Sequence, residues 1–275
     1  MKQNPFSFYD FLGYMIPGAV LIYAIYFGFP NIKNMFINSF NLGLGVNSEL
    51  YIYIPAVILS YMLGHLLAIA SSIFVEGFSL YYNGYPSAFL FNIKKEFSFF
   101  VEDTNGVGNK TCKLSKEKII VMLVMLPVVV INLFFRKFKN QAKELPEPLR
   151  NVAFSRCRHV LKYKLKADVS NLDMSKGIDD DYFRLIYHYA FENSERHANK
   201  LQNYVALYGF SRNISFVFVA IFWASIIQKF IFKYETSYYY LIFSAILAYI
   251  FYIGFVKFYR RFTLEAVMAV CVIKN

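Results

Sequence analysis

Four long, almost uncharged stretches divide this chain into two pairs of hydrophobic segments around a polar middle. Lys229 carries the only full charge within them. The four stretches are Phe11–Phe29, Tyr51–Val75, Ile214–Phe232 and Tyr238–Val256. A bilayer core of about 30 Å needs roughly 20 apolar residues of helix to cross it. The pattern therefore predicts four transmembrane helices.

The composition agrees with a membrane protein. Hydrophobic residues make up 57% of the 275 residues, against about 45–50% in soluble domains. We therefore predict an all-α membrane protein with four transmembrane helices in two pairs and a helical, basic insert between them. The predicted divisions are a first pair (1–76), the insert (77–212), a second pair (213–256) and a tail (257–275).

The distribution of basic residues predicts the orientation. The insert carries 21 Lys or Arg residues, whereas the loop Pro30–Leu50 carries only Lys33. Loops rich in Lys and Arg stay on the cytoplasmic side. We therefore expect the insert, the N-terminus and the C-terminus to be cytosolic.

A fifth apolar stretch, Ile119–Phe135, has 17 residues and no charge. Basic residues flank it on both sides, so a true span would place one basic cluster outside. Pro127 at its centre breaks a straight helix at a cost of about 3 kcal/mol. We favour a re-entrant segment or a buried cytosolic helix over a fifth span.

The end of the insert is expected to reach the membrane as a helix. Acidic residues at 179–181 suit a helix N-terminus, and an amphipathic run follows from Tyr182 to about Tyr208. We expect this helix to continue into the third span through Gly209 and Arg212. It would then couple the insert to the membrane.

The second span carries small residues at four-residue spacing, with a histidine beside them. The candidate packing or pore residues are Ser60, Gly64, His65, Ala68 and Ser72. Small residues let helices approach closely in lipid. Packing within one subunit is the simpler explanation, and a subunit interface or pore lining is the alternative. His65 is either a functional group or a neutral residue hydrogen-bonded between helices.

A basic tract from Arg136 to Lys166 holds ten Lys or Arg and two acidic residues. Its charge predicts an anionic partner, and its aromatic residues could stack on bases. Lipid headgroups at the membrane surface explain the charge equally well, and plain cytosolic charge is a third explanation. The candidate ligand-binding residues, for a nucleotide or oligonucleotide, are Arg136, Lys137, Lys139, Arg156, Arg158, Lys162 and Lys164.

No pattern typical of an enzyme, a metal site or a cofactor site is found. The segment 106–111 resembles a phosphate-binding loop but has Asn109 where that motif needs glycine. Cys157 and His159 lack the spacing of zinc ligands. A lipid-modifying enzyme would have to use Asp10, His65 and Glu76. We therefore predict no catalysis, no metal and no cofactor.

Short motifs in the first ninety residues resemble a group of bacterial membrane proteins. They are Phe8-Tyr-Asp-Phe11, Pro17-Gly18, the residues Tyr61, Gly64, His65, Ser71, Ser72 and Glu76, and Gly84-Tyr-Pro-Ser87. In these motifs the chain is similar to the Hailong-type membrane effectors of anti-phage defence, which occur beside nucleotidyltransferase-like partners.

The resemblance implies a homo-oligomeric pore in the bacterial inner membrane. A nucleotide or nucleic-acid signal on the cytosolic side would hold it shut or open it, and opening would depolarise the infected cell. The resulting hypothesis is a ligand-gated, channel-like effector. The alternative is a membrane-anchored scaffold that recruits a cytosolic partner without conducting ions.

Overall fold

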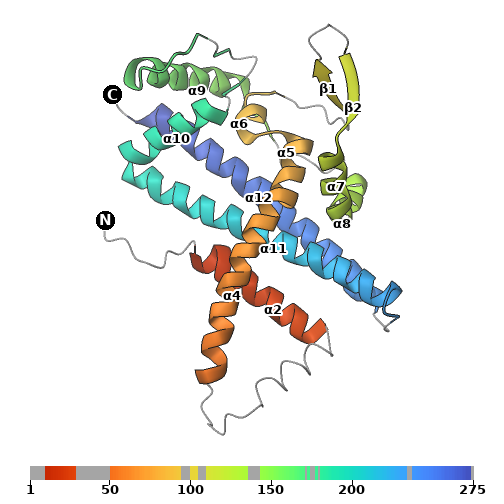
Figure 1. The fold of residues 1–275 in the computed structure, drawn as a ribbon. Coiled ribbons are helices and arrows are strands. Elements are labelled where there is room, and N and C mark those ends of the chain that lie inside the picture. The colour runs from red at the N-terminus through yellow and green to blue at the C-terminus, as the bar shows by residue number, and fades with distance from the viewer. Residues whose placement is uncertain are drawn as a thin grey trace.

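The structure is a computed structural model, and it is built mainly of helices (Figure 1). It describes residues 10–28, 50–93, 100–104, 110–135, 143–170, 172–173, 177–178, 180–233 and 237–273. Four helical segments are long and apolar enough to cross a membrane, as the sequence predicts. They are Phe11–Gly28, Ile54–Phe89, Glu195–Phe230 and Tyr238–Val272.

The first two of these segments change their helical type along the way. The first consists of the π-helix η1 (Phe11–Met15) and α2 (Ile16–Gly28). The second consists of α4 (Leu50–Ser71), the π-helix η2 (Ser72–Glu76) and α5 (Gly77–Asn83), and the short helix α6 (Pro86–Phe89) follows after a turn.

The other two segments are single helices, α11 (Glu195–Phe230) and α12 (Tyr238–Val272), which pack against each other along their length (Figure 1). At 1.5 Å per residue they are about 54 and 52 Å long, so each exceeds a bilayer core by more than 20 Å. The boundary predicted at Val256 is not a structural one, because α12 continues without a break to Val272.

The expected coupling helix is shorter than the sequence suggests. Helix α10 (Asp180–Asn193) ends at Ser194, whose backbone is extended, and α11 begins at Glu195. From there α11 continues unbroken past Gly209 and Arg212, as expected. The amphipathic pattern runs through both helices, so it gave no indication of the break at Ser194.

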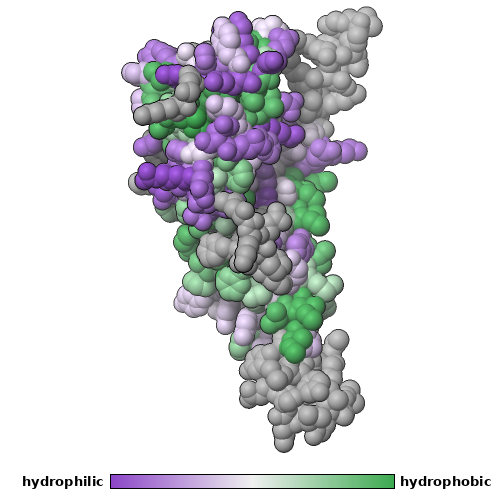
Figure 2. Space-filling view, turned by 90° about the vertical axis from the view of Figure 1, so that its left-hand side faces the viewer, coloured by the Kyte–Doolittle hydropathy of each residue, from purple (hydrophilic) through white to green (hydrophobic). Residues whose placement is uncertain are grey.

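Helices from three parts of the sequence form a second, more polar unit, which we call the polar domain. It comprises α6, α9 (Glu147–His159), the π-helix η4 (Val160–Lys164), α10, the first turns of α11 and the last turns of α12. Its core joins α9 to α12 through residues such as Phe154, Cys157, Phe262 and Ala266. Figure 2 shows hydrophilic residues gathered over the upper part of the molecule, where these helices lie, and hydrophobic residues below.

Between α6 and α9 lies a β-hairpin that the sequence analysis did not anticipate. Strands β1 (Phe100–Thr104) and β2 (Lys110–Leu114) pair antiparallel, with Phe100 opposite Leu114. Neither strand, FVEDT or KTCKL, alternates strictly between apolar and polar residues, which is the pattern that predicts a half-buried strand.

The fifth apolar stretch forms two helices rather than one. Helices α7 (Lys116–Val124) and α8 (Leu126–Phe134) meet at Met125 with a bend of 79°. Pro127 lies in the first turn of α8, where a missing backbone N–H costs nothing. The predicted effect of Pro127 is therefore confirmed, since the stretch is not a straight helix.

Candidate functional site

The first two hydrophobic segments cross at very short range. A Cβ atom built on Gly18 would lie 1.8 Å from the Ser60 carbonyl oxygen, and one on Gly64 would lie 2.0 Å from the Tyr14 carbonyl oxygen. Only glycine fits at either position, because the obstacle in each case is backbone. Ser60 and Gly64 therefore serve packing within the subunit, which is the simpler of the two explanations offered above.

The predicted stripe of small residues does not stay on one face. Ser60 and Gly64 are buried, Ala68 is half-buried and Ser72 is exposed. Four residues turn an α-helix by about 400°, so a four-residue spacing drifts by about 40° at each step. The buried face follows the helical period instead, in steps of four and three residues, through Ser60, Gly64, Leu67, Ser71, Val75 and Phe78.

His65 lies between helices, but its observed contacts are aromatic. Its ring stacks on Tyr14, with centroids 4.0 Å apart, and meets the edge of Tyr61 at 4.6 Å. Glu76 is eleven residues further along, or roughly 16 Å of helix. The two side chains are therefore too far apart to act on one small group.

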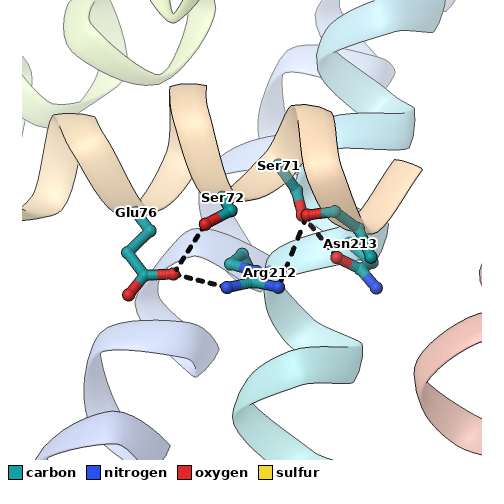
Figure 3. A network of polar contacts seen from close by, with 6 residues as sticks. Ser71, Ser72, Glu76, Arg212 and Asn213 are labelled. Carbon is teal, nitrogen blue, oxygen red and sulfur yellow. Dashed lines mark hydrogen bonds and ion pairs between the residues drawn. The ribbon is translucent and has the colours of Figure 1, made fainter. Parts of the chain in front are cut away.

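A buried ion pair joins the second and third hydrophobic segments. Arg212 on α11 donates a hydrogen bond to the Glu76 carboxylate on η2, and both side chains are largely buried, with 13% and 22% exposed (Figure 3). The Ser72 hydroxyl donates to the same carboxylate at 3.4 Å. A second Arg212 nitrogen donates to the Ala68 carbonyl at 3.5 Å.

The next residue of α11 extends this network to the first segment. Ser71 donates to the side-chain oxygen of Asn213, and the Asn213 amide donates to the Gly13 carbonyl at 2.6 Å. Figure 3 shows Ser71, Ser72 and Glu76 facing Arg212 and Asn213. Ser71 and Asn213 are buried, so the hydrogen bond between them replaces the hydrogen bonds that water would otherwise make. The network therefore links three of the four long segments.

The network coincides with two π-helical turns. Gly13 lies in η1, and both Ser72 and Glu76 lie in η2. Such turns widen the backbone locally and are frequent at functional sites. Ser71 and Glu76 were named from the sequence, but nothing there connected them with Arg212 or Asn213. A polar Asn beside Arg212 at the start of a span was the available signal.

The basic candidates on α9 and η4 form an exposed surface. Arg156, Arg158, Lys162 and Lys164 are all exposed, and none forms an ion pair with a residue that the structure describes. Arg136, Lys137 and Lys139 lie outside the described residues. We call the four described side chains the basic surface.

Aromatic rings accompany this basic surface. Tyr163 is 63% exposed, its ring lies 4.8 Å from that of His159, and the Lys162 ammonium lies 5.3 Å from its centroid. An exposed ring among exposed cations can stack on a base while the cations contact phosphates. The opposite side of α9 is buried against the end of α12. Binding at the basic surface would therefore act on a helix that packs on α12.

An ion-pair cluster also ties α11 to α12 inside the polar domain. The Glu265 carboxylate contacts the His197 ring nitrogen Nδ1 at 2.7 Å and the Lys200 ammonium at 3.2 Å. The two long helices are thus joined by charges at this end and by apolar contacts along the rest of their length.

No family model, no curated protein and no solved structure matches this chain.

Proposed function

We propose that the protein is a homo-oligomeric, ligand-gated, channel-like effector of the bacterial inner membrane. In this proposal an anionic nucleotide or oligonucleotide binds the basic surface of α9 and η4 on the cytosolic side. The single observation that carries the proposal is the continuity of α12, which runs without a break from its contact with α9 through the length of a membrane span.

The chemistry of the basic surface supports an anionic ligand. Arg156 and Arg158 offer planar groups suited to phosphate oxygens, and Tyr163 offers a face for a base. A shift of α9 on ligand binding would move the end of α12, because their buried side chains form one core. The close packing of α11 against α12 would carry the shift to Arg212 and its network.

The proposed site can be tested with purified protein in liposomes. The probe is a short fluorescent oligothymidylate, and the readouts are its binding and the efflux of K⁺. We expect binding to change the efflux and to weaken as salt rises, because phosphate contacts release counterions. The double substitution Arg156→Glu and Arg158→Glu should abolish both effects.

A matched control reverses two other exposed arginines in the polar domain, Arg184→Glu and Arg196→Glu. This variant should bind and respond like the wild type. Equal affinity of the α9 variant and the wild type for the probe would overturn the proposed site.

The second candidate function is a membrane-anchored scaffold that does not conduct ions. One observation favours it: Ser60 and Gly64, which were candidates for a pore or subunit interface, are used for packing within the chain. A bilayer that stays impermeable while the oligothymidylate binds would support the scaffold. A role in anti-phage defence beside a nucleotidyltransferase-like partner is part of the proposal only through the resemblance of the first ninety residues.

A further inference from the structure

The bent pair α7–α8 carries an exposed hydrophobic face that no described part of the protein covers. Val121, Met125 and Val128 are buried against the long helices, with exposed fractions of 5% or less. The outward face is strongly apolar and exposed; it consists of Ile120, Leu123, Leu126, Val130, Leu133 and Phe134. A large exposed apolar face marks a contact with a membrane or a partner.

The chain segments before and after the pair both belong to the polar domain. Phe89 and Leu90 precede it in the sequence, Leu145 and Phe154 follow it, and all four lie in one core. The Leu145 amide donates to the Leu90 carbonyl at 3.0 Å. Each helix has nine residues and is about 13.5 Å long, which is roughly half of a bilayer core. The pair is therefore expected to enter and leave the membrane on the same side.

A backbone carbonyl group at the break between the two helices has a hydrogen-bond partner, as an apolar environment requires. A helix end leaves carbonyl groups without partners, and these are costly away from water. The indole N–H of Trp223 on α11 donates to the Val124 carbonyl at 2.8 Å, at the end of α7.

Basic residues stand at the polar end of this face. Lys116 is exposed and Lys118 lies 5.9 Å above the ring of Tyr81, while Glu117 offsets one of these charges. The positive charge of Lys116 and Lys118 complements an anionic leaflet and not a neutral one.

We propose that α7–α8 is a re-entrant element that inserts its apolar face into one leaflet and binds anionic phospholipid headgroups through Lys116 and Lys118. Lipid is the occupant that the structure favours, because the exposed face continues directly from helices long enough to span a membrane. This inference does not depend on the proposed ligand or on channel activity.

The single tryptophan of the chain makes the inference measurable, because Trp223 contacts the break. The protein is placed in phosphatidylcholine liposomes that contain a small, equal fraction of either brominated phosphatidylglycerol or brominated phosphatidylcholine. Bromine quenches nearby tryptophan. We expect stronger quenching by the anionic lipid, with the excess falling at high salt.

The double substitution Lys116→Gln and Lys118→Gln should reduce the excess, by on the order of fivefold in local lipid enrichment for each lysine. The matched control, Arg184→Gln and Arg196→Gln, should keep it. Equal quenching of the wild type by the two lipids would overturn the headgroup preference. Absence of quenching by both would overturn the re-entrant placement, and neither result needs the variants to fold.

Discussion

At the scale of single residues, the crossing of the first two hydrophobic segments depends on glycine. A methyl group at position 64 would overlap the Tyr14 carbonyl, whereas a methyl group at Gly77 would meet nothing within 4 Å. The two positions lie on the same continuous helical segment. They therefore form a matched pair in which the same substitution has opposite expected effects.

We predict that Gly64→Ala destabilises the protein by about 3 kcal/mol, the upper range for overpacking, because backbone atoms cannot rotate away. Gly77→Ala should be neutral or stabilising by up to about 1 kcal/mol, since alanine favours helix. Thermal unfolding in detergent measures both. Equal stability of Gly64→Ala and the wild type would contradict the close crossing.

The buried pair of Glu76 and Arg212 gives a second prediction. Removing one partner leaves an uncompensated charge, so Glu76→Gln or Arg212→Gln alone should cost about 3–5 kcal/mol. The double variant should cost less than the sum, because no lone charge remains. Asp181→Asn with Arg184→Gln is the control, since that pair is exposed and 3.9 Å apart. Additive losses in the Glu76–Arg212 cycle would show that the contact is not formed.

The thiol of Cys157 gives a prediction on pH. Burial raises its pKa well above the ordinary value, because the thiolate would be desolvated in the core of the polar domain. An unfolded thiol ionises near pH 8.5. The unfolded chain therefore releases a proton above that pH while the native chain keeps it, so the stability of the folded domain is fully present below pH 8.5 and falls as pH rises.

This effect can be followed by alkylation in a Cys112→Ser, Cys271→Ser background. Raising the pH from 7 to 8 accelerates alkylation of an exposed thiol by about tenfold, whereas Cys157 should remain slow until the domain unfolds. Rapid labelling of Cys157 at pH 8 under native conditions would place it at the surface instead.

At the scale of elements, the four hydrophobic segments could be predicted because each is a local property of about 20 residues. The residues at which the helices end could not be predicted. Helix α12 continues past Val256 because Phe262, Ala266 and Val270 are buried by α6, α9 and α10, and nothing local to the sequence identifies those partners. Likewise, the charged face of the coupling helix gave no sign of the break at Ser194.

The candidate site shows the same division between local and long-range information. The exposure of Arg156, Arg158, Lys162 and Lys164 follows from their positions on an amphipathic helix and was predictable. The network was not, because Glu76 and Arg212 are 136 positions apart and Asn213 reaches Gly13 across 200. Such pairs are determined by the crossing of helices and not by any spacing in the sequence.

At the scale of the whole molecule, the two long helices α11 and α12 connect the polar domain to the four apolar segments. Helix α12 is the more direct connection for a signal from the basic surface, because α9 packs on its last turns. Lys257 lies between the two parts and is exposed. A substitution there changes the helix without removing a buried side chain.

We predict that Lys257→Pro uncouples the two parts. Proline removes a backbone hydrogen bond and clashes with the preceding turn, at a cost of about 3 kcal/mol. The polar domain should still bind the oligothymidylate with unchanged affinity, which also shows that it remains folded, whereas the K⁺ efflux should no longer respond. Lys257→Ala removes the same charge but keeps the helix, so it should respond like the wild type. An efflux that still follows binding in Lys257→Pro would show that α12 does not carry the signal, and α11 would then be the connection to test.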